Sequence, residues 1–128
     1  MTYTINYSTA NKVVTLSIVG LVKMSQSMNI IDEMIHLGRE NKCNLFVLNG
    51  DKVIIQDNFI EVYTLLDKLG LCFQKRRDRL AIVFKKQKNI FGFIDSIAIN
   101  HGISLKSFDD SGRAHRWLNF KPSNNHTT

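Results

Sequence analysis

The sequence predicts a single α/β domain, in which helices pack on a mostly parallel sheet with an antiparallel edge strand. Three observations support this fold class. The chain opens with two extended runs, short apolar runs then alternate with segments of helical periodicity, and no repeat or linker interrupts the alternation. The predicted order is β-β-α-β-α-β-α-β-α. Helices must join its parallel strands, because parallel neighbours need a long crossover.

The two N-terminal strands are predicted from residue type and alternation. Residues 2–8, TYTINYS, alternate polar and apolar side chains, and residues 12–20, KVVTLSIVG, are rich in β-branched residues. TANK between them suits a hairpin turn. After Gly20 the apolar residues recur at helical spacing, which predicts a helix that begins at Ser25 or Ser27. Its apolar face carries Met28, Ile31, Met34, Ile35 and Gly38.

The middle of the chain predicts two strands that are buried on both faces. NLFVLN (44–49) and RLAIVF (79–84) are short continuous apolar runs, as central parallel strands require. Between them we expect a loop, GDKVIIQ, and then a helix that Asp57 caps and Gly70 ends. The apolar residues of this helix share one face: Phe59, Val62, Tyr63, Leu66 and Leu69.

The last three elements end in a cap that carries the chain's only tryptophan. We expect a helix over about 88–101 that ends at Gly102, and then a strand over 103–108. Asp109 or Asp110 can cap the closing helix. Its apolar stripe stands at i, i+3 and i+4 and anchors the cap in the core through the large indole ring: Ala114, Trp117 and Leu118.

Composition predicts one cytoplasmic domain. Apolar residues make up 44% of the chain, yet no stretch approaches the roughly 20 apolar residues that cross a bilayer. The N-terminus lacks the basic-then-apolar layout of a secretion signal. Cys43 and Cys72 have no metal-ligand spacing and are expected to be small buried thiols. We expect the domain over residues 1–120 and a polar tail over 121–128.

Three local features resemble one family. They are Val19–Gly20 followed by a serine-capped helix, RLAIVF entering a helix that contains FGF, and the ending FDDSGRAHRWL. In this order they resemble the STAS domain, and within it the SpoIIAA-like family, whose fold is also similar to the Sec-type lipid-transfer fold. The resemblance spans about residues 1–120 and implies the α/β fold predicted above.

The resemblance implies a binding or regulatory module rather than an enzyme, acting on a protein partner or as a homodimer. In the anti-sigma-factor antagonists of the family, a serine at the start of the second helix is phosphorylated. Here residues 49–63 contain no serine or threonine, and Thr64 falls well inside the predicted helix. We therefore expect a module that lacks the serine phosphoswitch.

The search for catalytic chemistry finds no phosphate-binding glycine loop and no nucleophile elbow. The histidines have no metal-ligand spacing, and we expect neither a metal nor a cofactor. Two enzymatic alternatives stay open: a dispersed site in which Asp51, Asp57 or a histidine activates water, and a cysteine paired with a distant histidine.

Positive charge is concentrated in the C-terminal part. Of 17 Lys and Arg residues, 11 fall after residue 70 with 4 of the 11 acids, so residues 1–70 carry a net −1 and residues 71–128 a net +7. QKRRDR and KKQK lie at opposite ends of the fourth predicted strand, roughly 20 Å apart. Neither run interleaves aromatic residues or glycine, so nucleic acid is not an expected partner. Peripheral contact with a membrane stays open.

KKQK precedes a predicted helix, where an anion would relieve the conflict between lysines and the helix dipole, although solvated lysines that add solubility explain the run better. This gives an alternative function, binding of a small apolar or anionic molecule, including a lipid. Large adaptable side chains that can line its cavity, or simply pack the core, are Met24, Met28, Met34, Phe59 and Phe91.

Ligands of open α/β sheets bind at the carboxyl ends of the strands. The candidate site residues at these ends are Asn49, Gly50, Asp51, Asp57, Asn58, Phe59, Lys85, Lys86 and Lys88.

Overall fold

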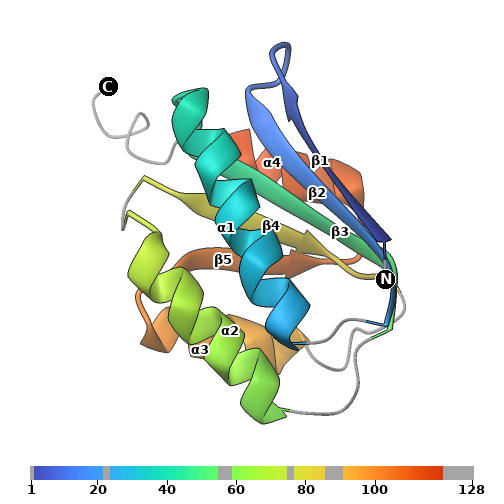
Figure 1. The fold of residues 1–128 in the computed structure, drawn as a ribbon, viewed down its shortest axis with the longest axis vertical. Coiled ribbons are helices and arrows are strands. Elements are labelled where there is room, and N and C mark those ends of the chain that lie inside the picture. Colours follow the sequence, from blue (N-terminus) through green and yellow to red (C-terminus); the bar gives the residue numbers. More distant parts are fainter. Residues whose placement is uncertain (1, 22–23, 55–58, 75–76, 86–90, 120–128) are drawn as a thin grey trace.

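In the residues described by the computed structural model, five strands form one sheet in chain order (Figure 1). The structure describes residues 2–21, 24–54, 59–74, 77–85 and 91–119, with the backbone alone at 24–25, 53–54, 59–62 and 91. The predicted tail 121–128 lies outside them. β1 is antiparallel to β2 and the later strands are parallel: β1 (Thr2–Ser8), β2 (Val13–Leu21), β3 (Leu45–Ile54), β4 (Arg79–Val83) and β5 (Ser104–Phe108).

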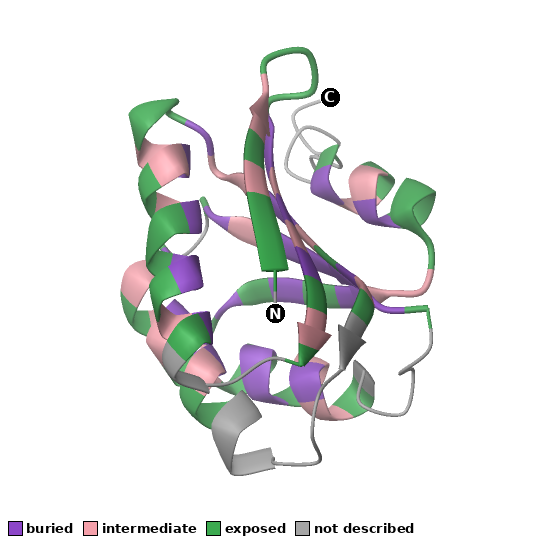
Figure 2. Ribbon diagram, turned by 45° about the vertical axis from the view of Figure 1, so that its right-hand side comes forward, coloured by how far each residue is buried: buried purple, intermediate pink, exposed green. Residues whose placement is uncertain are grey.

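The helices form two layers around the sheet. α1, α2 and α3 join successive parallel strands, and right-handed crossovers with an unreversed strand order place all three on one face. α4 packs on the opposite face, mainly against β4 and β5 (Figure 2). This confirms the predicted fold class. The described helices are α1 (Met24–Glu40), α2 (Phe59–Cys72), α3 (Phe91–Asn100) and α4 (Ser111–Asn119). None of them is long and apolar enough to span a membrane.

The sheet serves two cores because its side chains alternate between faces. Leu16 of β2 points into the large core beneath α1, α2 and α3, which Met34 and Phe46 also fill. Val13 of the same strand points into a small core beneath α4. The small core contains Val13, Val47, Ala81, Val83, Ala114 and Leu118.

Trp117 sits at the edge of the small core rather than inside it. Ala114 and Leu118 are buried as predicted, but the indole is half-buried beside the Phe108 ring, with 5.7 Å between ring centroids. The Arg79 guanidinium covers the indole at 4.2 Å from its centroid and donates to the Leu118 carbonyl over 3.2 Å. Burial lowers the pKa of Arg79. One member of the basic run QKRRDR therefore holds α4 on the sheet.

Three predicted boundaries are wrong. α1 begins at Met24, so Ser25 and Ser27 lie inside the helix and do not cap it. β3 does not end at Asn49: after a register shift opposite Ser17, its last residues continue along β2 as far as Ile54. Gly-Asp-Lys resembles a turn in sequence, but Gly50 and Asp51 lie at the register shift within β3, and pairing with β2 resumes at Lys52. α2 likewise runs through Gly70 to Cys72, so Gly70 does not end the helix.

A buried ion pair ties α1 to the loop before β4. The Asp78 carboxylate is fully buried and accepts two hydrogen bonds from the Arg39 guanidinium, at 2.9 and 2.6 Å. The Gln74 backbone N–H also donates to Asp78, over 2.6 Å. The hydrogen bonds to Asp78 raise the pKa of Arg39. Because the carboxylate has no access to water, its charge depends on these partners.

We predict that Arg39→Met destabilises the protein by about 2 to 4 kcal/mol, since it leaves a buried carboxylate without its cation. The measurement is urea unfolding at neutral pH. Arg77→Met is the matched control, because Arg77 is exposed and its loss should change the unfolding free energy by less than about 0.5 kcal/mol. Equal unfolding midpoints for the two variants would contradict the prediction.

Candidate functional site

An apolar cavity of about 100 Å³ lies in the large core, between the sheet and the helices on its covered face. Its walls come from β2, β3 and β4 on one side and from α1, α2 and α3 on the other. The described lining residues are Leu16, Ile18, Ser27, Ile30, Ile31, Met34, Leu48, Leu65, Leu66, Leu69, Leu80, Ile82, Phe84 and Ile94.

The cavity is unusual for a core of this size. Native interiors are close-packed, with few voids larger than a water molecule. Cavities lined by aliphatic side chains stay dry, and one of about 150 Å³ binds benzene or xenon. The walls can therefore accept an apolar group, and its entry would restore the lost packing contacts.

A polar cluster lies beside this cavity, and it consists of Asn49, Gly50 and Asp51 of β3 and of Lys85, which follows β4. Asp51 accepts a hydrogen bond from the Lys85 backbone N–H over 3.3 Å, and its other oxygen is 3.6 Å from the Lys85 ammonium. Asn49 accepts from the Asp51 N–H over 3.2 Å. Gly50 lies flat against the Phe84 ring, where any Cβ would collide with it. Phe84 also lines the cavity, so one ring separates the polar cluster from the apolar space.

The structure thus brings together four of the predicted site residues: Asn49, Gly50, Asp51 and Lys85. Phe59 begins α2, but its side chain is outside the described set. The other predictions lie outside the described residues: Asp57, Asn58, Lys86 and Lys88. That these residues bind a ligand stays a prediction.

Sequence reasoning missed most of the cavity wall. Of the five residues proposed to line a cavity, Met34 does so, and Met28 is half-buried without lining it. The side chains of Met24, Phe59 and Phe91 are not described. The wall is built from ordinary leucines and isoleucines, and nothing in the sequence distinguishes such a residue from one that packs a filled core.

The described titratable side chains lie outside the cavity wall. None of the described lining residues carries one, and the described residues hold no cluster of three or more His, Cys, Asp and Glu side chains that suits a metal ion. His101 bridges α3 and α2: Nε2 is 3.1 Å from Asp67, Nδ1 is 2.9 Å from the Ile97 carbonyl, and the ring meets Tyr63 edge-on. These contacts hold the two helices together.

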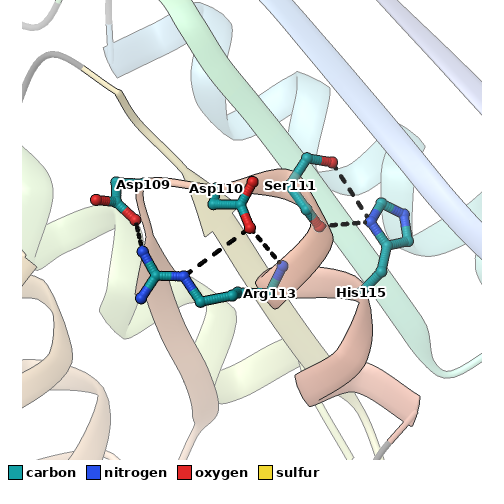
Figure 3. Close-up of polar contacts among 5 residues, drawn as sticks. All are labelled: Asp109, Asp110, Ser111, Arg113 and His115. Carbon is teal, nitrogen blue, oxygen red and sulfur yellow. Dashed lines mark hydrogen bonds and ion pairs between the residues drawn. The ribbon is translucent and has the colours of Figure 1, made fainter.

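The start of α4 contains a serine and a histidine, drawn in Figure 3. His115 Nδ1 is 3.4 Å from the Ser111 hydroxyl but 2.9 Å from the Ser111 carbonyl oxygen. A carbonyl only accepts, so Nδ1 carries the proton and cannot act as the base of a Ser–His pair. Asp110 caps the helix by accepting the Arg113 N–H over 3.0 Å, and Asp109 pairs with the Arg113 guanidinium. These contacts stabilise the first turn of α4.

Comparison with known proteins identifies solved structures with a similar fold. No protein-family model and no curated protein sequence matches the chain. Its structure is similar to the anti-sigma factor antagonist SpoIIAA in its unphosphorylated form, with 12% identity, a TM-score of 0.55 and coverage of 93% of this chain and 100% of that one. It is also similar to an uncharacterized protein of the DUF3478 family from Shewanella loihica PV-4, with 14% identity, a TM-score of 0.57 and coverage of 91% and 92%. The chain therefore has the SpoIIAA-like, or STAS-type, α/β fold that the sequence resemblance implied.

Proposed function

We propose that the protein is a non-enzymatic binding module whose ligand places an apolar group in the cavity. The cavity carries this proposal. It offers about 100 Å³ walled by aliphatic and aromatic side chains, with Ser27 as the single polar residue among the described lining. Such a site can hold a short aliphatic chain or a small ring, and none of its described lining residues carries a titratable side chain.

The polar cluster beside Phe84 favours an amphiphile with an anionic head. Lys85 directly follows the wall residue Phe84, and its ammonium side chain is 63% exposed. At 3.6 Å from Asp51 it makes only a loose ion pair, which leaves it able to meet a second anion. A carboxylate or phosphate head at Lys85 would place the attached chain at the Phe84 side of the cavity.

The fold resemblance also supports binding to a protein partner or to a second copy. This is compatible with the cavity, because the lining comes from α1, α2 and α3 and a ligand there can alter the surface of these helices. We propose that such regulation does not use a serine phosphoswitch. α2 begins at Phe59, residues 49–63 lack serine and threonine, and Thr64 lies within the helix.

The cavity predicts that benzene stabilises the protein. At ten times its dissociation constant, benzene should add about 1.4 kcal/mol and raise the Tm by about 5 °C. Ile31→Trp, which extends a ring into the cavity, should abolish this shift. Ile35→Trp is the matched control: it lies one turn later on α1, is half-buried and does not line the cavity, so the shift should remain. A benzene shift unchanged in Ile31→Trp would place the binding elsewhere.

The polar cluster predicts a separate effect on anionic amphiphiles. Lys85→Ala should weaken hexanoate binding about threefold, the strength of an exposed ion pair, and leave 1-hexanol binding unchanged. Isothermal titration calorimetry measures both. Lys106→Ala, which removes an exposed lysine from the opposite face of the sheet, should change neither. Equal losses for the acid and the alcohol would show that Lys85 acts by packing and not by charge.

A further inference from the structure

The outer edge of β1 has the properties of a self-pairing strand. Within the described sheet β1 pairs only with β2, in seven consecutive residue pairs without a bulge. Its sequence, TYTINYS, contains no charge and no proline. Soluble proteins normally protect an open edge with charges, proline, bulges or short length. The other edge follows this practice, because β5 has five residues and carries Lys106.

The backbone polarity of β1 shows which residues face outward. The Ser8 carbonyl accepts the Lys12 N–H over 2.7 Å across the hairpin turn, so it points toward β2. Because successive residues of a strand direct their N–H and C=O groups to opposite edges, Tyr3, Ile5 and Tyr7 present theirs to the open edge. Their side chains share the sheet face that α1 covers, since they pair with Ile18, Leu16 and Val14 of the large core.

TYTINYS is also self-complementary about its central residue. When two copies run antiparallel with a two-fold axis at Ile5, each Ile5 faces the partner's Ile5 and each Tyr3 faces the partner's Tyr7. On the other face Thr4 meets the partner's Asn6, and Thr2 meets the partner's Ser8. Every pair matches side chains of the same kind, and aromatic and β-branched pairs stabilise antiparallel strands. In this arrangement the backbone groups of Tyr3, Ile5 and Tyr7, which face the open edge, form the hydrogen bonds with the partner strand.

We propose that two copies of this chain pair through β1, antiparallel about a two-fold axis at Ile5, and form one continuous sheet. This register gives about six new backbone hydrogen bonds. Electrostatic repulsion between the two copies does not oppose this strand pairing. The whole chain carries a net charge of +6, but residues 1–70, which include β1, carry a net −1. The nearby Glu33 carboxylate accepts the Tyr3 hydroxyl at 2.9 and 3.0 Å, and this hydrogen bond raises the pKa of Tyr3. The phenol therefore stays neutral at the edge. This inference is independent of the cavity.

The first test uses charge at the exposed pair Thr4 and Asn6. Light scattering after size exclusion should give twice the chain mass for the wild type. Thr4→Lys combined with Asn6→Lys sets lysine against lysine across the axis, and should raise the dimer dissociation constant at least tenfold. Thr4→Lys combined with Asn6→Glu sets lysine against glutamate and should keep the dimer. A monomeric wild type, or a dimer indifferent to both pairs of substitutions, would overturn the proposal.

The second test fixes the register and does not depend on the charged variants folding. Ile5→Cys should form an intermolecular disulfide on mild oxidation, because directly opposed residues have Cα atoms about 5.5 Å apart. Tyr3→Cys is the control, since the two copies of residue 3 would lie about 13 Å apart. Mass spectrometry after trypsin identifies the linked peptide. A disulfide through Tyr3→Cys, or none through Ile5→Cys, would rule out this register.

Discussion

Strand order constrains most of the structure. Because β2 to β5 follow one another without reversal, the three crossover helices must all lie on one face. That face receives a deep core, while on the other the described residues place the short α4 alone, held by a small core and by Arg79 against Trp117. The same order leaves β1 at an edge, where no crossover helix passes outside it. The cavity and the open edge both follow from this topology.

α1 forms part of the cavity wall and packs closely on the sheet at its C-terminal end. α1 is held at its C-terminal end, where Arg39 pairs with the buried Asp78 and Gly38 lets the helix approach the Phe46 ring. A Cβ at Gly38 would stand 2.6 Å from that ring. The lining residues of α1 fall between Ser27 and Met34, and the contacts of Gly38 and Arg39 follow them toward the C-terminal end of the helix. Close packing at one end therefore accompanies free space toward the other.

Much of the fold follows from local patterns, because periodicity and apolar runs report burial directly. The order of elements, the hairpin turn and the buried stripe of Ala114 and Leu118 were all predictable. The end of β3 was not, because Gly50 to Lys52 have turn chemistry, yet the strand continues through a register shift and pairs with β2 again from Lys52. Asp51 and Lys85 were both predicted to belong to one candidate site, and the structure brings them together, although Asp51 lies within β3 and not at its end. A cavity was predicted only as an alternative, and Met34 is the one described wall residue that was named, since a leucine beside empty space and a leucine in a filled core look the same in sequence.

The central claim is that the cavity is a ligand site, and methyl NMR tests it most directly. The protein, labelled at Ile and Leu methyl groups, would be titrated with hexanoate. The account predicts shifts confined to the lining, with Ile31, Leu48 and Ile82 among the largest. Shifts confined instead to the exposed Leu71 and Ile99, or none at saturating hexanoate, would contradict it.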